Sequence, residues 1–374
     1  MPTFPQDLPS WLRHIESLHP QTIALELTRV KPVCDALALR PKFPIISVTG
    51  TNGKGSSCAM LVSIYRAAGY RVACYTSPHL LSYNERVSVN GRLVSDAKLC
   101  QAFEAVEKAR QHLKVALTYF EMGTLAAMWH FMRCEVDLAV LEVGMGSRLD
   151  AVNVWDADVA IVTSVGLDHQ AYLGTTRDEI GAEKAGIYRP LCPAICGDTN
   201  PPHGLIHYAE AIDADLQLIG RDFAVQSNLQ EWHYLASGID WCLPRPNLIG
   251  DVQLNNAACV ISAVRALTAL PVTLTAITEG LCQIQISGRF ERIAESPTVI
   301  VDVAHNPHAA IVLADNLRAS FVSGGRVYAV FAMLSDKDIA GVVRALSSSV
   351  DIWYVANIDD ARGASADTVA TIIG

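Results

Sequence analysis

The chain has 374 residues, and its 51% hydrophobic and 18% charged content is sufficient for two buried cores at roughly 150 residues per domain. A net charge of −9 excludes a general nucleic-acid binder, because phosphate backbones select basic protein surfaces. The N-terminus lacks a signal-peptide pattern and no apolar run reaches the roughly 18 residues of a membrane span, so we expect no membrane partner. Ten scattered cysteines are typical of buried reduced thiols and predict a cytoplasmic protein.

The first forty residues predict a helical segment that packs against the first sheet. Residues 6–40 show helical patterns, and we expect breaks at Pro20 and Pro32 because proline interrupts helices. No residue in this segment indicates chemistry by itself.

Residues 46–57, ISVTGTNGKGSS, predict a buried strand, a glycine loop and a helix that continues to about residue 68. Such a loop turns backbone N–H groups toward a phosphate chain, and the helix N-terminus adds positive charge. Lys54 can bind the β- and γ-phosphates of ATP, and Ser56 or Ser57 can offer a hydroxyl to Mg²⁺. An ordinary glycine turn is the alternative. The predicted ATP-binding residues are Gly50, Thr51, Asn52, Gly53, Lys54, Gly55, Ser56 and Ser57.

Three further polar residues follow predicted strands. Ser77 comes after strand 71–75, Glu142 closes the apolar run of 137–142, and His169 follows strand 159–165. Because ligands bind at the carboxyl edge of a parallel sheet, these three indicate a metal site there. Turn chemistry for Ser77, an ion pair for Glu142 and a structural role for His169 are the alternatives. A hairpin turn is expected at Asn90 and Gly91.

Three residues leave their chemistry open. Phe120 and Glu121 precede an apolar helix over 122–132. Phe120 can be a core anchor and Glu121 a helix cap, or the two can be an aromatic platform and a hydrogen-bond acceptor for a flat heterocycle. The residues alone favour the anchor and the cap. Lys184 lies among small and apolar residues, and burial would lower its pKa enough to let the neutral amine form a carbamate. The residues alone favour an ion pair with Glu183 or a phosphate contact for Lys184.

The second half of the chain predicts another α/β pattern. Strand-like runs fill 193–250, a helix covers 254–270, and a turn over 287–291 marks a boundary. Strands follow at 298–302, 327–331 and 352–355, with helices between them and a final helix after residue 362. We therefore predict an α/β protein: a P-loop-type, mostly parallel sheet in residues 1–286 and a smaller Rossmann-like α/β domain in residues 287–374.

Several motifs together resemble one family. The stretches TGTNGKGS, YTSPHL, NERVSVNG, TYFEMGTLAAMW, LEVGMGSRLDAVN, TSVGLDHQAYLG, GAEKAGI, NNAA, SGRFE, VDVAHNPHAA and MLSDKDI occur in family order. They resemble the bifunctional dihydrofolate synthase/folylpolyglutamate synthases, the folate branch of the Mur ligase superfamily. Departures are modest: Ser147 stands where the family usually repeats glycine, and Ile286-Ser287 stands where Trp-Pro is common.

The resemblance implies an ATP-dependent acid–amino-acid ligase. Such an enzyme adds L-glutamate to dihydropteroate, forming dihydrofolate, and to tetrahydrofolate and other reduced folates, through an acyl phosphate. It implies a monomer with ATP as co-substrate and two Mg²⁺ ions. The alternatives are a monofunctional folylpolyglutamate synthase, an inactive folate- or ATP-binding homologue, and a Mur-type ligase for a nucleotide-sugar peptide.

The resemblance also assigns roles to individual residues. Metal ligands would be Ser77, Glu142, His169 and an N6-carboxylated Lys184; further nucleotide contacts would be Asn256, Arg289, Asp302 and His305; the pteroate or folate site would include Phe120, Glu121, Asp150 and Ala151. Lys54, Lys184 and His305 would be the catalytic residues, with the second domain closing over ATP. Because the family's second domain normally continues for a further strand and helix, a truncated second domain is expected.

Overall fold

The computed structural model describes residues 4–374 except 22, 229, 321–324 and 361. The chain forms two compact units: Met1–Asn247 with Leu254–Ile284, and Leu248–Gln253 with Gln285–Gly374. None of the helices in the described ranges is long and apolar enough to cross a membrane.

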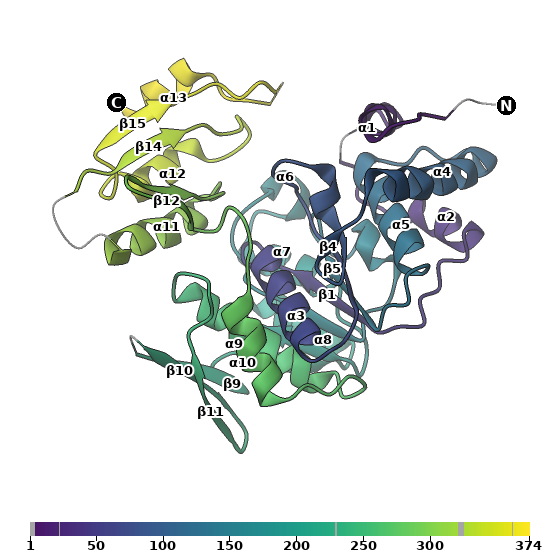
Figure 1. Ribbon diagram of the computed structural model, residues 1–374, viewed down its shortest axis with the longest axis horizontal. Coiled ribbons are helices and arrows are strands. Elements are labelled where there is room, and N and C mark those ends of the chain that lie inside the picture. The colour runs from purple at the N-terminus through teal and green to yellow at the C-terminus, as the bar shows by residue number, and fades with distance from the viewer. Residues whose placement is uncertain (1–3, 22, 229, 321–324, 361) are drawn as a thin grey trace. The chain divides into compact units, whose positions relative to one another are not determined.

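An eight-stranded sheet organises the first unit (Figure 1). Its strands are β1 (Ile45–Thr49), β2 (Val72–Tyr75), β3 (Val87–Val89), β4 (Arg92–Leu93), β5 (Leu138–Glu142), β6 (Val159–Val162), β7 (Pro193–Cys196) and β8 (Asp215–Leu218). They lie in the order β4-β3-β2-β5-β1-β6-β7-β8. Six neighbouring strands are parallel, namely β2, β5, β1, β6, β7 and β8. The hairpin β3–β4 extends the β2 edge in antiparallel pairing. The carboxyl ends of β1, β2, β5 and β6 therefore meet at one edge of the sheet.

Helices cover this sheet. They are α1 (Leu8–Glu16), α2 (Val30–Ala36), α3 (Lys54–Ala67), α4 (Asp96–Leu113), α5 (Tyr119–Phe131), α6 (Gln170–Leu173), α7 (Arg177–Ala185), α8 (His203–Ala211), α9 (Val252–Ala266) and α10 (Leu274–Gln283), with short turns η1 (Tyr83–Arg86) and η2 (Ala151–Val154). Strand residues alternate between faces: Tyr75 and Leu141 join the core cluster of α1, α2, α4 and α5, whereas their neighbours Cys74 and Val140 are buried outside that cluster. A sheet buried on both faces explains the continuously apolar strands.

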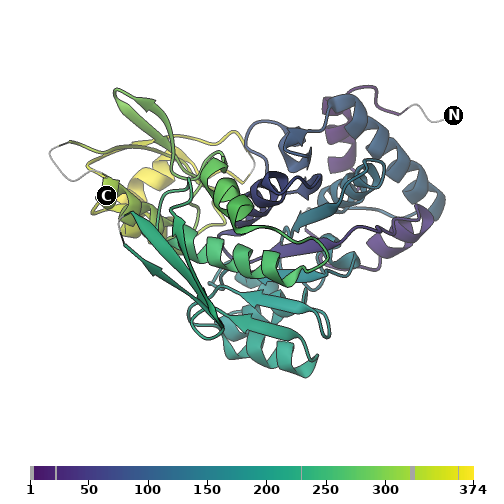
Figure 2. The same ribbon diagram turned by 60° about the horizontal axis from the view of Figure 1, so that its bottom comes forward.

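A second, antiparallel sheet belongs to the same unit. It consists of β9 (Phe223–Ser227), β10 (Glu231–Ala236) and β11 (Ile239–Pro244). Trp232 and Tyr234 on β10 are fully buried, and the Tyr234 hydroxyl hydrogen-bonds the Ser262 hydroxyl of α9 at 2.9 Å. Figures 1 and 2 both show this sheet next to α9 and α10. One face thus packs inward while the other is open to solvent.

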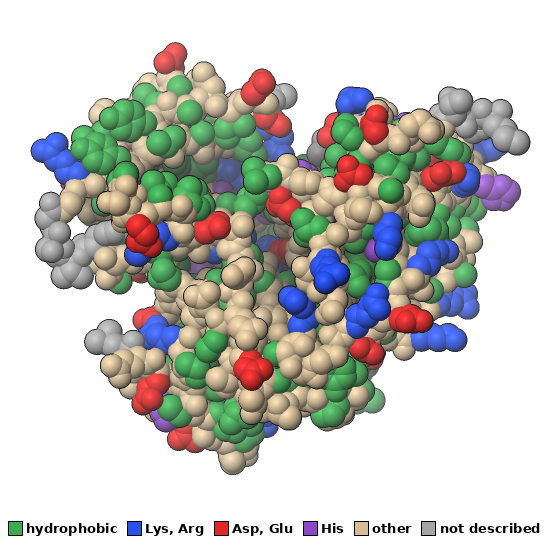
Figure 3. All heavy atoms as spheres, viewed as in Figure 1, with side chains coloured by type: hydrophobic (Ala, Val, Ile, Leu, Met, Phe, Trp, Pro, Cys, Tyr) green, Lys and Arg blue, Asp and Glu red, His purple; other side chains and the backbone are tan. Residues whose placement is uncertain are grey.

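The second unit contains β12 (Glu291–Glu295), β13 (Thr298–Val301), β14 (Tyr328–Phe331), β15 (Ile352–Val355), α11 (Pro307–Ser320), α12 (Ile339–Leu346) and α13 (Ala366–Ile373). β12 and β13 form an antiparallel pair, and β14 and β15 a parallel pair. Phe331 and Trp353 pack on the core of the helices, whereas Tyr328, Val330 and Tyr354 are exposed on the opposite face. Figure 3 shows hydrophobic side chains on the surface around these strands.

The expected α/β class with a mostly parallel first sheet and a smaller second α/β part is confirmed. The strand–loop–helix at residues 45–67, the buried strand that ends at Glu142, and the turn at Asn90 and Gly91 form as predicted; both turn residues have positive φ angles of 52° and 73°. Two expectations were wrong. Residues 23–29 are not helical, and Pro32 lies in the first turn of α2, where proline is tolerated, rather than at a break. The helices α8 and α10 were not predicted.

Candidate active site

The phosphate loop connects β1 to α3 through two glycines that no other residue could replace without strain. Gly53 caps α3 with φ of 87°, and Gly50 has φ of 149°. A Cβ on Gly50 would lie 1.9 Å from the Thr163 hydroxyl, and one on Gly53 would lie 2.6 Å from the Asn256 side-chain oxygen. Both glycines are therefore required by conformation and by close packing. Asn256, about 200 residues further along the chain, is placed directly against the loop.

The loop is held by the end of the neighbouring strand β6. The backbone N–H of Thr51 donates to the Ser164 carbonyl at 2.8 Å, and that of Asn52 donates to the Ser164 hydroxyl at 3.1 Å. The Thr163 hydroxyl donates to the Asn52 carbonyl at 2.6 Å. These bonds fix the loop before any ligand binds. Sequence reasoning missed Thr163 and Ser164, although both belong to the TSVGLDHQ stretch.

Lys54, the first residue of α3, extends back over the loop. Its Nζ donates to the carbonyls of Gly50 at 2.8 Å and Thr51 at 3.2 Å. Gly55, Ser56 and Ser57 follow in the first helical turn, where N–H groups favour anions, although that of Ser57 already donates to the Gly53 carbonyl at 2.9 Å. Among the described side chains the buried Ser57 hydroxyl is one of few polar atoms without a hydrogen-bond partner. Because buried hydroxyls normally have a partner, this one fits the role of a ligand to a phosphate or a cation.

Ser77 and Glu142 meet at the carboxyl edge of the sheet. Glu142 is the last residue of β5, pairs with Val48 of β1, and is 4% exposed. Its Oε2 accepts the backbone N–H of Ser77 at 3.0 Å. A buried carboxylate and a nearby hydroxyl at the end of a nucleotide-binding strand are donors of the kind that Mg²⁺ prefers. These residues therefore fit the expected metal site.

Lys184 and His169 occupy the adjoining loop and helix. Lys184 on α7 is buried, and burial together with the charge of Lys54 lowers its pKa to about 7, although Asp168 and Glu183 oppose the shift. His169 has a left-handed φ of 51°, and its backbone N–H donates to the Asp168 carboxylate at 2.8 Å. Lys184, Lys54 and Asp168 thus interact in one place, and a fraction of Lys184 is neutral near pH 7. Asp168 was missed by sequence reasoning.

The second part of the site is aromatic. The Phe120 ring lies against Gly144, where a Cβ would come within 2.6 Å of the ring, and its centroid is 5.8 Å from that of Tyr75. Asp150 is buried beside it, with Ala151 next in the chain and 4% exposed. The Asp150 carboxylate accepts backbone N–H groups from Gly144, Met145 and Val152 at 3.1, 3.0 and 2.9 Å. Burial nevertheless raises the pKa of Asp150 to about 7.

The carboxylate of Glu121 performs the capping role that the sequence left open. Its Oε2 accepts the Thr118 N–H at 2.7 Å, and the Thr118 hydroxyl accepts the Glu121 N–H in return. Its Oε1 accepts from the Arg29 guanidinium at 2.8 Å. Glu121 therefore anchors α5 and orients Arg29, a residue that sequence reasoning did not select.

The second unit brings together the three remaining predicted residues. Asp302 follows β13, and its carboxylate accepts the N–H groups of Phe290 and Ala304, both at 2.8 Å. Burial raises the pKa of Asp302, while these bonds and the charges of Arg289 and His305 oppose the shift. The Nδ1 of His305 hydrogen-bonds the Val303 carbonyl at 3.0 Å. Arg289, Asp302 and His305 thus form one polar cluster within this unit.

Comparison with known proteins places both units in one family. The Mur ligase middle domain matches residues 48–264, and the Mur ligase glutamate ligase domain matches residues 288–374. The dihydrofolate synthase/folylpolyglutamate synthase of Escherichia coli is 44% identical, over 98% of this chain and 86% of its own length. The Haemophilus influenzae protein of the same name is 35% identical, over 96% and 85%.

Solved structures agree with this. E. coli FolC in complex with DHPP and ADP superimposes with a TM-score of 0.95 at 43% identity, over all of this chain and 89% of that one. A bifunctional folylpolyglutamate synthase/dihydrofolate synthase with Mn, AMPPNP and L-glutamate bound gives a TM-score of 0.92 at 41% identity, over 99% and 88%. The chain therefore belongs to the Mur ligase family, in its dihydrofolate synthase/folylpolyglutamate synthase branch.

Proposed function

We propose that this protein is an ATP-dependent ligase that adds L-glutamate to dihydropteroate, forming dihydrofolate, and to tetrahydrofolate and other reduced folates. The observation that carries the proposal is the fixed glycine loop with Lys54 in a chain that is 44% identical to a dihydrofolate synthase/folylpolyglutamate synthase over 98% of its length. A monofunctional folylpolyglutamate synthase is not favoured, because the relatives at higher identity carry both names.

The reaction needs two steps. A carboxylate oxygen of the folate substrate attacks the γ-phosphorus of ATP and releases ADP, which gives an acyl phosphate. The amine of glutamate then attacks the acyl carbon, loses a proton, and displaces inorganic phosphate, which leaves with the original carboxylate oxygen. Catalysis of this chemistry consists of positioning and charge neutralisation, so no covalent enzyme nucleophile is required.

In this proposal the phosphate loop and Lys54 bind the ATP phosphates. The loop backbone from Gly50 to Ser57 would lie along the phosphate chain, and Asn256 supports the loop beside Gly53. Ser77, Glu142, His169 and a carboxylated Lys184 would hold two Mg²⁺ ions, which neutralise phosphate charge when bound. The proposal extends to Arg289, Asp302 and His305 of the second unit as further nucleotide contacts.

The carbamate on Lys184 is proposed because the amine is buried with a pKa near 7. A neutral amine adds to carbon dioxide and loses a proton, which converts a buried cation into a carboxylate. That change would give the second metal ion an anionic ligand and relieve the repulsion between Lys184 and Lys54. The same burial therefore favours the neutral amine, which reacts with carbon dioxide, and disfavours the charged amine, which the carbamate replaces.

The pteroate side is proposed to lie at Phe120, Glu121, Asp150 and Ala151. The Phe120 ring offers a stacking surface for a flat heterocycle, and the Asp150 carboxyl can exchange hydrogen bonds with ring donors. Glu121 would act by holding Arg29 and the start of α5. We further propose domains at residues 1–286 and 287–374, a monomer, and a cytoplasmic location.

The test is ADP release by the purified protein with ATP, Mg²⁺ and glutamate, and with either dihydropteroate or tetrahydrofolate. Both substrates should support release, and omission of glutamate should leave no amide product. Extension of tetrahydrofolate alone would identify a monofunctional enzyme. A failure of both substrates would contradict the proposed function.

A further inference from the structure

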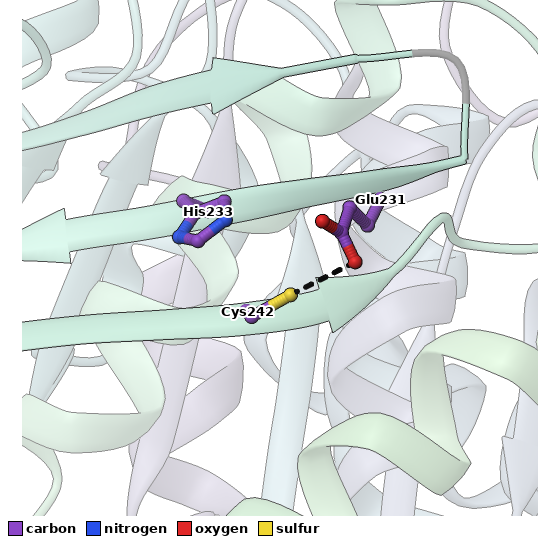
Figure 4. A group of neighbouring side chains, drawn as sticks. All are labelled: Glu231, His233 and Cys242. Carbon is purple, nitrogen blue, oxygen red and sulfur yellow. Dashed lines mark hydrogen bonds between the residues drawn. The ribbon is translucent and has the colours of Figure 1, made fainter.

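The open face of the β9–β10–β11 sheet carries a group of metal-binding side chains outside the candidate active site. Glu231 and His233 are two residues apart on β10, so their side chains share one face, opposite the buried Trp232 and Tyr234. His233 pairs across the ladder with Cys242 of β11. Figure 4 shows the three side chains together on neighbouring strands.

The spacing of the three side chains suits a small cation. One ligand atom from each residue lies within 4.8 Å of the other two. The Cys242 Sγ and the Glu231 Oε2 are 3.3 Å apart. Metal–ligand bonds of about 2.0–2.3 Å at tetrahedral angles separate two ligand atoms by roughly 3.3–3.8 Å. One edge of a tetrahedron is therefore already formed, and rotation of the exposed Glu231 and Cys242 side chains can bring both within range of an ion bound to His233.

Asp240 orients the histidine for this purpose. Its Oδ1 lies 2.6 Å from the Nδ1 of His233, so the neutral ring donates its Nδ1 proton to Asp240 and keeps the lone pair on Nε2. A carboxylate that fixes the tautomer of a histidine is the usual outer partner of a zinc ligand. Asp240 comes from β11, the strand that also carries Cys242. Two neighbouring strands thus supply both the ligands and the group that orients them.

We propose that Glu231, His233 and Cys242 bind one zinc-class divalent cation, with solvent in the fourth position. Thiolate, imidazole and carboxylate are the ligand types of Zn²⁺, whereas Mg²⁺ takes octahedral oxygen ligands. On binding, the Cys242 thiol releases its proton to solvent, and the thiolate and the Glu231 carboxylate together balance the charge of the cation. The bound ion joins β10 to β11 and stabilises the sheet without entering the ligase reaction.

The experiment uses the full chain, stripped of metal and then saturated with Mg²⁺, and titrates it with Co²⁺ as a spectroscopic substitute for Zn²⁺. We expect one Co²⁺ to bind with an intense thiolate-to-cobalt charge-transfer band that Zn²⁺ abolishes. Cys242→Ser should lose the band and weaken binding at least about tenfold. Asp240→Ala should keep the band and weaken binding by roughly 10- to 100-fold, because it removes only the orienting partner.

Cys282→Ser is the matched control, because Cys282 is also exposed but lies on α10; it should behave as the unmodified chain. The substituted side chains are exposed, and an unchanged circular dichroism spectrum checks that each variant folds. The absence of a charge-transfer band up to ~1 mM Co²⁺ would overturn the proposal. A band that survives in Cys242→Ser would assign the metal to another thiol and would overturn it equally.

Discussion

The phosphate-loop region and the Phe120–Asp150 region lie on the same sheet but handle buried charge in opposite ways. In the first, burial lowers the pKa of Lys184 to about 7; in the second, burial raises the pKa of Asp150 to about 7. Desolvation disfavours the charged form of either group, so the pKa of the buried base falls and the pKa of the buried acid rises toward the same value. One region thereby gains a neutral amine next to Lys54, and the other a carboxyl group next to an aromatic ring.

The difference between the regions also lies in how they are held. The phosphate loop is fixed by a hydrogen bond donated by Thr163, by one accepted by Ser164, and by close contact with Asn256. The Phe120 region is fixed by ring packing and by three N–H groups that point at Asp150. The first arrangement suits a polyanion and the second a flat heterocycle with few polar atoms. The following experiments test this contrast, from the largest expected effect to the smallest.

Loss of Lys54 should have the largest effect. Lys54→Ala removes the only charge that the loop itself presents to the phosphates and should lower turnover about a thousandfold. Steady-state ADP release measures this, with Lys42→Ala as the control for an exposed lysine. A Lys54→Ala enzyme that keeps a tenth of the turnover would contradict the assignment of the loop.

The carbamate on Lys184 should be worth at least about a hundredfold in turnover, because even the outer partners of metal ligands are worth roughly 10- to 100-fold. Lys184→Ala should be nearly inactive and should be partly rescued by small carboxylates such as acetate, which can occupy the vacated space. Lys184→Arg keeps a charge but cannot form the carbamate, so it should be inactive and not rescued. Full activity of Lys184→Ala without acetate would show that no carbamate is needed.

The close packing of the loop can be separated from its backbone conformation. Gly53 and Gly69 have similar φ angles of 87° and 90°, but a Cβ would meet Asn256 only at Gly53, and at Gly69 it would meet nothing within 4 Å. Gly69→Ala should cost about 1 kcal/mol of stability and leave ATP affinity unchanged. Gly53→Ala should weaken ATP binding at least about tenfold in a calorimetric titration. Equal ATP affinities in the two variants would refute a packing role for Asn256.

The smallest effect is on stability as a function of pH. Between about pH 4 and 7 folded Asp150 holds a proton that the unfolded chain has lost, so its contribution to stability is present at low pH and is lost as the pH rises. Between about pH 7 and 10.5 the unfolded chain protonates Lys184 while the folded chain does not, so stability rises with pH. Each slope is at most about 1.4 kcal/mol per pH unit.

Urea unfolding of the metal-free protein across this pH range measures both slopes. Asp150→Asn should remove the fall below pH 7, and Lys184→Met the rise above it, relative to the unmodified chain. Each variant should leave the other slope in place, because the two groups belong to different regions. If the stability of a variant changes with pH just as that of the unmodified chain does, the replaced group does not have the shifted pKa that we assign to it.

Local patterns were sufficient to predict the elements around the phosphate loop. The glycine spacing, the apolar run that ends in Glu142 and the Asn90-Gly91 pair each specify their own backbone, so the structure matches them. The unpredicted helix α10 contains a glycine and three β-branched residues, Thr275, Ile277 and Thr278, which lower its helix propensity, although Thr273 does cap it. The opposite holds for residues 23–29: their apolar pattern has a helical period, but in the structure they do not form a helix.

The contacts of the site were harder to foresee because they join distant parts of the chain. Asn256 lies beside Gly53, and Arg29 pairs with Glu121 across 92 positions. No local period or spacing encodes such pairs, since they arise only when the sheet and its helices are assembled. Residues in recognisable motifs, such as Lys54 and Glu142, could be predicted from sequence, whereas their partners, such as Thr163 and Asp168, could not.

The most direct test of the central claim follows one oxygen atom. Dihydropteroate labelled with oxygen-18 in its carboxylate is incubated with the enzyme, ATP, Mg²⁺ and glutamate, and the released phosphate is analysed by mass spectrometry. If the carboxylate attacks the γ-phosphorus and glutamate displaces phosphate from the acyl carbon, each phosphate released with an amide carries one labelled oxygen. Amide formation accompanied by unlabelled phosphate would contradict the account.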